Sequence, residues 1–221
     1  MILTEKPTQK KLQSAFSLAE LATVIAVLVI LMGSGAHLLG NTGSHARKYG
    51  SDLLMNMIEN ARDTAIATRG NVILAIAEPG DLENTDERCR LGVFKVDTWP
   101  EPFNGKVIKA FQKGRWRTLE PGLTINGGNL DGLDNPLDAP EITIQYGNAS
   151  KPRSAKVHAI AFNSRGGIIL PASANPVLMR ISNGSYHNGK AMPRQRGNNV
   201  AITEDKIKVG RITVRPYRIN E

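Results

Sequence analysis

Three aspartates lie close together in a stretch that is also rich in glycine, asparagine and proline. These residues are Asp131, Asp134 and Asp138. Clustered carboxylate oxygens suit a hard cation, which makes this stretch a candidate calcium site. The spacing does not follow the EF-hand pattern, however, and the same residue types are typical of a solvated turn. We therefore expect no metal here and retain the aspartates only as a weak calcium candidate.

A set of basic residues near the end of the chain could bind phosphate groups. Its members are Lys206, Lys208, Arg211, Arg215 and Arg218, with Arg194 and Arg196 in a preceding loop. They belong to a basic region, because residues 151–221 contain 13 lysines and arginines against 3 aspartates and glutamates. Such a stripe could bind a nucleic acid by counterion release, or could face acidic lipid headgroups or an acidic partner. A solvated basic surface is the more common outcome for this pattern.

Residues that could catalyse a reaction form no recognisable pattern. The four histidines are His37, His45, His158 and His187, and none belongs to a metal or triad motif. Cys89 is the only cysteine, so it cannot form an intrachain disulfide. Its neighbours Arg88 and Arg90 could lower its pKa, but without a base nearby we expect an incidental surface thiol. The sequence thus predicts neither an enzyme nor a cofactor.

The remaining chemistry lies in one carboxylate inside an apolar stretch. Glu20 stands near the start of the apolar residues 16–39, behind a polar leader that carries Lys6, Lys10 and Lys11. At about 1.5 Å per residue, residues 21–39 as a helix would cross most of a bilayer core of about 30 Å. A carboxylate at the edge of such a segment is costly and usually functional. A simpler role would be to favour the positive end of its helix dipole.

The residues around Glu20 resemble the prepilin-type cleavage and methylation motif of type IV pilins and type II secretion pseudopilins. The segment Ala15-Phe16-Ser17-Leu18-Ala19-Glu20-Leu21 has the order of that motif: a small residue, Phe, a hydroxyl residue, two apolar residues and Glu. The resemblance implies that a prepilin peptidase cuts between Ala15 and Phe16, and that Phe16 is then N-methylated. It also implies that Glu20 pairs with the amino terminus of a neighbouring subunit, so that two buried charges offset each other during assembly.

Two residues depart from that motif. Ala15 stands where the family usually has Gly, and Ala19 stands where it usually has Ile or Val. Because Ala is the smallest step from Gly, we still expect cleavage, at a reduced rate. The alternative is an ordinary signal peptide, in which Lys10 and Lys11 form the basic region and residues 34–36 form a small-residue cleavage site.

A helix and a series of strands must position these residues. Residues 52–67 predict an amphipathic helix whose apolar stripe, at three- and four-residue steps, is typical of packing on a sheet. The stripe consists of Leu54, Met57, Ile58, Ala61 and Ala65. From residue 71 onward, short β-branched or alternating segments separated by Gly, Asn and Pro predict an antiparallel β domain. The expected strands are 71–77, 91–96, 106–112, 116–119, 142–146, 157–162, 167–170, 177–181, 200–202 and 207–214, with a hairpin turn at Gly114.

Short segments of the β region extend the resemblance. Residues 159–167 are similar to a hairpin of GspH/FimT-type minor pseudopilins, and residues 210–214 are similar to their final strand. Gly210-Arg211 also begins like the Gly-Arg-x-Arg element of DNA-uptake pilins, but the second Arg is absent. The expected fold is α+β, with a long N-terminal hydrophobic helix, as in pilins, packed on an antiparallel β-sheet domain of one or two sheets. The expected division is a cytoplasmic leader at 1–15, a transmembrane or filament-core helix at 16–39, its amphipathic continuation at 40–70, and a periplasmic β domain at 71–221.

The resemblance predicts a minor pseudopilin, which is a structural subunit of a type II secretion pseudopilus or a type IV pilus. Its expected partners are other pilins or pseudopilins, the prepilin peptidase and methyltransferase, and the inner membrane. The chain would cross that membrane once and place its C-terminal domain in the periplasm. Two alternatives stay open: a DNA-binding minor pilin that uses the C-terminal basic residues, and an exported β protein with a plain signal sequence.

Overall fold

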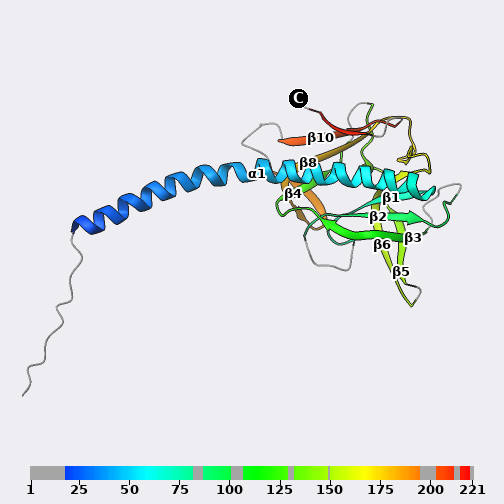
Figure 1. The fold of residues 1–221 in the computed structure, drawn as a ribbon, viewed down its shortest axis with the longest axis horizontal. Helices are drawn as coiled ribbons and strands as arrows, with labels where there is room; N and C mark the ends of the chain where they lie inside the picture. The colour runs from blue at the N-terminus through cyan, green and yellow to red at the C-terminus, as the bar shows by residue number, and fades with distance from the viewer. Residues whose placement is uncertain are drawn as a thin grey trace, which may run out of the picture. The chain divides into compact units, whose positions relative to one another are not determined.

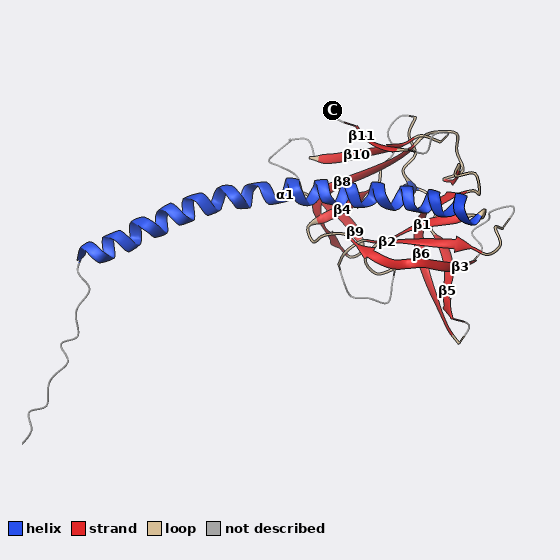
Figure 2. Ribbon diagram, in the orientation of Figure 1, coloured by secondary structure: helices blue, strands red, loops and turns tan. Residues whose placement is uncertain are grey.

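The structure, a computed structural model, is a set of β-sheets with one long helix (Figures 1 and 2). It describes residues 18–81, 87–100, 107–128, 132–148, 150–194, 203–211 and 215–219, and for residues 29–43 it describes the helical backbone alone. The chain divides into two compact units, Met1–Thr42 and Gly43–Glu221. All the strands among the described residues belong to the second unit.

The long helix α1 comprises Leu18–Thr68 and contributes to both units. Within the second unit its predicted apolar stripe is confirmed, since all five stripe residues are buried. The helix ends where Arg69 takes a left-handed φ of 47° and the amide of Gly70 donates to the carbonyl of Ala65 at 3.2 Å. This is the usual way in which a helix satisfies its last carbonyls before the chain turns into a strand.

Five strands form a sheet that closes on itself. They are β1 (Val72–Ala77), β2 (Arg90–Val96), β3 (Ile108–Thr118), β5 (Ile142–Asn148) and β6 (Lys151–Phe162). A short strand, β7 (Ile168–Leu170), pairs antiparallel with the end of β6. The order is β1-β2-β3-β5-β6, and β6 pairs back onto β1 with Phe162 opposite Val72. The interior holds an aromatic cluster in which the ring of Phe94 lies 5.2 Å from those of both Trp116 and Tyr146.

A second sheet covers part of the outside of the closed sheet. It contains β4 (Leu123–Asn126), β8 (Val177–His187), β9 (Lys190–Pro193), β10 (Glu204–Val209) and β11 (Pro216–Ile219), and a short 3-10 turn, η1, spans Pro136–Asp138. One core lies between α1, this second sheet and the outward side chains of β1, β2 and β6. The other core fills the closed sheet. The strands β1 and β2 lie between the two cores, so both faces of each strand are buried.

The predicted fold class is wrong. We expected an α+β fold in which a long hydrophobic helix packs on an antiparallel domain, but the structure is mainly β and is built around the closed five-stranded sheet. That sheet is also mixed, because β3 and β5 run parallel, with Ile108 opposite Ile144. Residues 119–141 leave the closed sheet after β3, supply β4 to the second sheet and then return. Parallel neighbours need such a long crossover, whereas the regular strand spacing had suggested hairpins throughout.

The predicted membrane anchor is also wrong. In the part of the chain that the structure describes, no helix is long and apolar enough to cross a membrane. The expected single-pass location in the inner membrane is therefore not supported.

Candidate functional site

The start of α1 carries a run of exposed apolar side chains. Every side chain from Leu18 to Leu28 is exposed, and we call these residues the exposed helix segment. Its large apolar members are Leu18, Leu21, Val24, Ile25, Val27 and Leu28, with exposed fractions from 86% at Leu18 to 48% at Leu28. A contiguous surface of this kind marks a place where another molecule binds.

Glu20 lies in the first turn of this segment. The carboxylate is thus beside the helix N-terminus, where the unsatisfied amides and the helix dipole favour negative charge. The predicted cleavage residues Ala15 and Phe16 lie outside the described residues, so the expected cut and the methylation stay predictions. In the same turn, the hydroxyl of Thr23 donates to the carbonyl of Ala19 at 2.7 Å.

The predicted C-terminal basic residues do not form one stripe. Arg211 points inward, where Nε donates to the carbonyl of Asn175 at 2.5 Å and Nη2 donates to the carbonyl of Pro171 at 2.7 Å. Nη2 also lies 3.6 Å from a carboxylate oxygen of Asp134. This guanidinium fastens the loop between β7 and β8, and it is therefore engaged within the domain.

Arg218 is engaged as well, at the other end of the same region. Its Nη2 pairs with Asp52 of α1 at 2.9 Å, and its Nε lies 3.6 Å from Asp205 of β10. Lys206 and Lys208 are partly buried on β10, Arg194 and Arg215 are exposed, and Arg196 lies outside the described residues. The predicted C-terminal basic residues are thus divided: some make contacts within the domain, and the others occupy separate surface positions.

The predicted calcium candidates bind separate partners. Asp134 accepts hydrogen bonds from the hydroxyl of Ser173 and from Nδ2 of Asn175, the latter at 3.1 Å. Asp138 accepts two from the amide of Gly128, both at 2.9 Å. Asp131 lies outside the described residues. Over the described ranges, no group of three or more His, Cys, Asp or Glu side chains is arranged to hold a metal ion.

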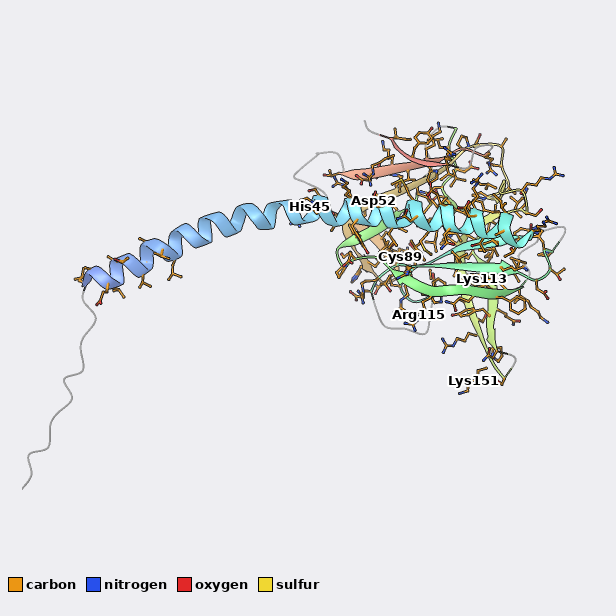
Figure 3. The ribbon with its side chains drawn as sticks, viewed as in Figure 1. His45, Asp52, Cys89, Lys113, Arg115 and Lys151 are labelled. Carbon is orange, nitrogen blue, oxygen red and sulfur yellow. The ribbon has the colours of Figure 1, made fainter. Side chains whose placement is uncertain are left out.

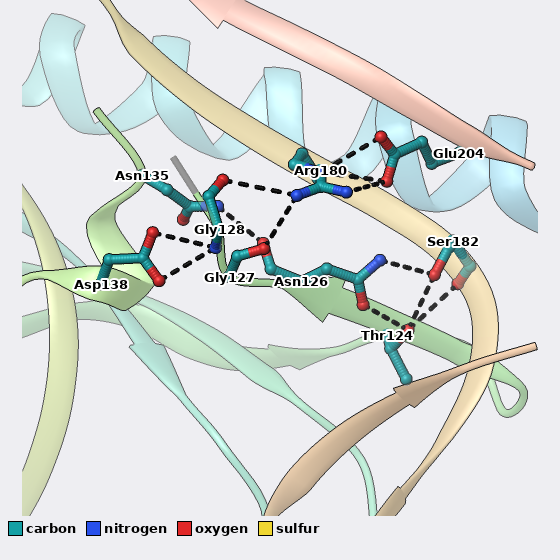
Figure 4. A network of polar contacts seen from close by, with 9 residues as sticks. All are labelled: Thr124, Asn126, Gly127, Gly128, Asn135, Asp138, Arg180, Ser182 and Glu204. Atoms are coloured by element: carbon teal, nitrogen blue, oxygen red, sulfur yellow. Dashed lines mark hydrogen bonds and ion pairs between the residues drawn. The ribbon is translucent and has the colours of Figure 1, made fainter. Parts of the chain in front are cut away.

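A buried polar network fastens the crossover between β4 and η1 to the second sheet (Figure 4). Arg180 of β8 pairs with Glu204 of β10 at 2.9 Å and donates to the carbonyl of Gly127 at 3.0 Å. Below it, Asn126 donates to the hydroxyl of Ser182 at 2.7 Å and accepts from that of Thr124 at 2.9 Å. These groups satisfy one another, so the network is a structural clamp and offers no nucleophile or base to a substrate.

The expectation of a surface thiol at Cys89 is wrong. The side chain is completely buried beside Tyr186, and burial raises the pKa of the thiol to about 12. Tyr186 is held in turn by the amide of Ile125, which donates to its hydroxyl at 3.1 Å. Burial also raises the pKa of Tyr186 well above its usual value. Neither group is ionised near neutral pH, so this pair is part of the core and not a reactive centre.

A carboxylate cluster at the end of β1 was missed by the sequence reasoning. Burial, with the nearby charges of Asp81 and Glu141, raises the pKa of Glu78 to about 7. The amide of Glu78 donates to the carboxylate of Asp81 at 2.8 Å, and Nε2 of His158 lies 3.8 Å from Glu141. Glu78 and Asp81 share the turn after β1, whereas Glu141 precedes β5 and His158 lies on β6, so no single local motif could have revealed the whole cluster.

A row of basic and aromatic side chains on β3 was also missed. Along this strand every second residue from Lys109 to Arg117 is exposed, and Figure 3 labels two of them, Lys113 and Arg115. The sequence had divided this segment into two strands with a turn at Gly114, whereas β3 continues through Gly114 at a φ of 82°. The sequence of this segment does predict an alternation of exposed and covered residues, but only if residues 108–118 are treated as one continuous strand.

Comparison of the chain with protein-family models, with curated proteins and with solved structures found no match.

Proposed function

We propose that the protein is a structural subunit of a filament, namely a minor pseudopilin of a type II secretion pseudopilus or a type IV pilus. It would be cut between Ala15 and Phe16 and assembled through the start of α1. The observation that carries this proposal is the exposed helix segment, Leu18–Leu28, which presents six large apolar side chains in eleven residues. No described group forms a catalytic arrangement that would favour an enzyme instead.

The size of this surface supports an obligate partner. Burying one large aliphatic side chain contributes about 1.5–3 kcal/mol, so covering six of them is worth roughly 10 kcal/mol before the entropy of association is subtracted. Only Glu20 and Thr23 interrupt the apolar side chains of this segment, and its large apolar members span about half of the helix circumference. Several neighbours are therefore needed to cover it, as in a bundle of subunit helices. A single docking groove would leave part of it in water.

Glu20 has a specific role in this proposal. Removal of the leader would create a positive amino terminus at Phe16, close to the same helix end. The Glu20 carboxylate of one subunit would then pair with the amino terminus of the next. A buried charge is costly unless a partner compensates it, so this pairing would favour one axial register between subunits and disfavour the others.

Crosslinking in cells tests this assembly. Because Cys89 is buried, a single cysteine introduced at Leu21 provides the one reactive thiol of the folded chain. We expect oxidation to give covalent dimers of Leu21→Cys, and we expect Glu20→Ala in that background to reduce them by about tenfold or more. Glu59→Ala is the matched control, since Glu59 is an exposed carboxylate on the same helix. Equal dimer yields in the Glu20 and Glu59 variants would contradict the role of Glu20, and absence of dimers in Leu21→Cys would contradict the assembly.

A further inference from the structure

The outer face of β3 is a continuous row of cations that contains one aromatic side chain. The exposed side chains occupy every second position of the strand: Lys109, Phe111, Lys113, Arg115 and Arg117. The alternate residues Ile108 and Ala110 are buried inside the closed sheet, and Trp116 packs there too. Side chains at every second position of a strand share one face. We call these five residues the β3 row.

An irregularity in the strand could have broken this row, but it does not. Lys113 lies opposite Val93 of β2, and Arg117 lies opposite Leu91. Over this interval β3 advances by four residues, from 113 to 117, while β2 advances by two, from 93 to 91. Because β3 has two extra residues here, an even number, the alternation of its side chains between the two faces is unchanged. Arg115 and Arg117 therefore stay on the same face as Lys109. Gly92 makes room for this bulge, because the ring of Trp116 lies where a Cβ on Gly92 would be, at 2.8 Å.

The charges of the β3 row are not used inside the domain. None of its four cations forms an ion pair or a side-chain hydrogen bond with a described residue, in contrast with Arg211 and Arg218. On the β5 side of the row, the outward positions carry no carboxylate: Thr143 and Gln145 lie on β5, and Lys156 and Ser154 lie opposite them on β6. Two carboxylates lie at the ends of the row: Asp97, whose amide donates to the carbonyl of Lys109 at 3.1 Å, and Glu120, which follows β3. The four cations outnumber these two carboxylates, so the potential over the middle of the row is positive.

Phe111 decides what kind of polyanion fits. Its side chain is 58% exposed, although it lies in the middle of the cations between Lys109 and Lys113. A flat exposed ring flanked by positive charges is the arrangement on which an unpaired base stacks while the neighbouring phosphates meet the cations. Bases in a duplex are already stacked and cannot use such a ring. The steps of about 6.6–6.8 Å between alternate residues place the cations in a line along an extended backbone.

We propose that the β3 row binds single-stranded nucleic acid, with Phe111 stacking on one base and Lys109, Lys113, Arg115 and Arg117 contacting phosphates. This site differs from the C-terminal basic residues that the sequence suggested, because those include Arg211 and Arg218, which are engaged within the domain. The inference is independent of the proposed filament role. A subunit that failed to assemble would still present the row, and an assembled subunit need not bind nucleic acid.

Fluorescence anisotropy with the full chain and a labelled 15-nucleotide oligothymidylate tests the proposal. Four phosphate contacts to a single strand predict a slope of about −2.8 for log K against log salt concentration. Lys109→Gln/Lys113→Gln should reduce that slope by about 1.4, since each lost contact removes about 0.7. Phe111→Ala should weaken binding about fivefold or more, because loss of stacking on one base costs at least that much.

A matched control separates the row from net charge. Arg165→Gln/Lys190→Gln removes two exposed cations from other parts of the domain and should leave the slope unchanged. The proposal is wrong if this control lowers the slope as much as Lys109→Gln/Lys113→Gln does, or if Phe111→Ala has no effect. It is also wrong if a duplex of equal length binds as tightly, or if vesicles with an anionic phospholipid displace the oligonucleotide as effectively as unlabelled oligothymidylate does. A circular dichroism spectrum identical to that of the wild type confirms that each variant is folded.

Discussion

Cys89 has an arginine on each side in the sequence, yet its thiol has no contact with water. The side chain is fully buried against Tyr186, and burial raises its pKa to about 12. Only the thiolate reacts with alkylating agents and disulfides, so both the pKa and the lack of access protect this group. We expect no reaction with a chromogenic disulfide reagent at pH 8 in the native protein, and one thiol per chain after denaturation in guanidinium. Rapid titration of one thiol in the native protein would contradict the buried position.

Glu78 predicts a pH dependence of stability. Its pKa is about 7 in the folded protein and about 4.5 when it is exposed, as in the unfolded chain. Between these two values the folded state holds a proton that the unfolded state has lost, so the contribution of Glu78 to stability decreases as the pH rises from 4.5 to 7. Above pH 7 the cost of a partly buried negative charge is present in full.

The substitution Glu78→Gln removes this cost while keeping the shape of the protonated side chain. We expect Glu78→Gln to unfold at a higher urea concentration than the wild type at pH 8, and at the same concentration at pH 4. Because Glu78 is only half-buried, solvent screening limits the gain at pH 8 to about 1 kcal/mol. A difference between the two proteins that is the same at both pH values would show that Glu78 does not retain its proton.

At the scale of the elements, the sequence predicts a helix or strand most accurately where its hydrophobic periodicity continues without interruption. The stripe from Leu54 to Ala65 is buried as expected because its three- and four-residue steps leave one face of α1 for the core. The strand β1 was likewise visible from its β-branched residues. The strand β3 was not, because Gly114 was taken as a turn residue, whereas it supplies the left-handed conformation of a bulge. The β3 row was missed for the same reason.

The ion pair that joins β8 to β10 predicts a stability effect at this scale. Arg180 pairs with Glu204 at 2.9 Å, and the side chain of Glu204 is only 9% exposed. Replacing Arg180 with Met leaves a buried carboxylate without its cation, which costs about 3 kcal/mol. We expect Arg180→Met/Glu204→Met to lose less than Arg180→Met alone, because the double variant leaves no charge uncompensated. Urea denaturation of the two variants measures this difference.

An exposed carboxylate provides the comparison for that experiment. Asp63 lies 3.4 Å from Arg62, and its side chain is 71% exposed. Asp63→Ala should change the free energy of unfolding by less than about 1 kcal/mol, since exposed ion pairs contribute little. If Arg180→Met were no more destabilising than Asp63→Ala, the network of Figure 4 would not be the clamp that its geometry indicates.

At the scale of the whole molecule, long-range contacts decide what the sequence cannot show. Asp205 of β10 accepts hydrogen bonds from Arg47 at 2.8 Å and from Ser51 at 2.7 Å, and Arg218 lies beside it. These contacts join the second unit's part of α1 to the last strands across more than 150 positions. The local sequence pattern predicts only that the C-terminal basic residues form a stripe on the surface. The division of those cations between structural contacts and the surface therefore appears only in the folded chain.

The closed sheet is a second property that only the whole chain has. Its strands were mostly expected, but the pairings β1–β6 and β3–β5 join segments that are far apart. Alternation and turn residues predict which residues lie in strands, yet they do not select partners. Regular spacing favoured an antiparallel series, and the long crossover through β4 makes a parallel pair instead. Nothing in the local pattern of residues 119–141 indicated that this segment supplies a strand to another sheet.

The central claim, assembly as a filament subunit, is tested most directly at its first step. We would measure the intact mass and the N-terminal sequence of the full chain recovered from cells with and without a prepilin peptidase. We predict a chain that begins at Phe16 with one added methyl group when the peptidase is present, and an uncut chain when it is absent. A chain that keeps residues 1–15 in both cases, or that begins elsewhere, for example at His37, would contradict it.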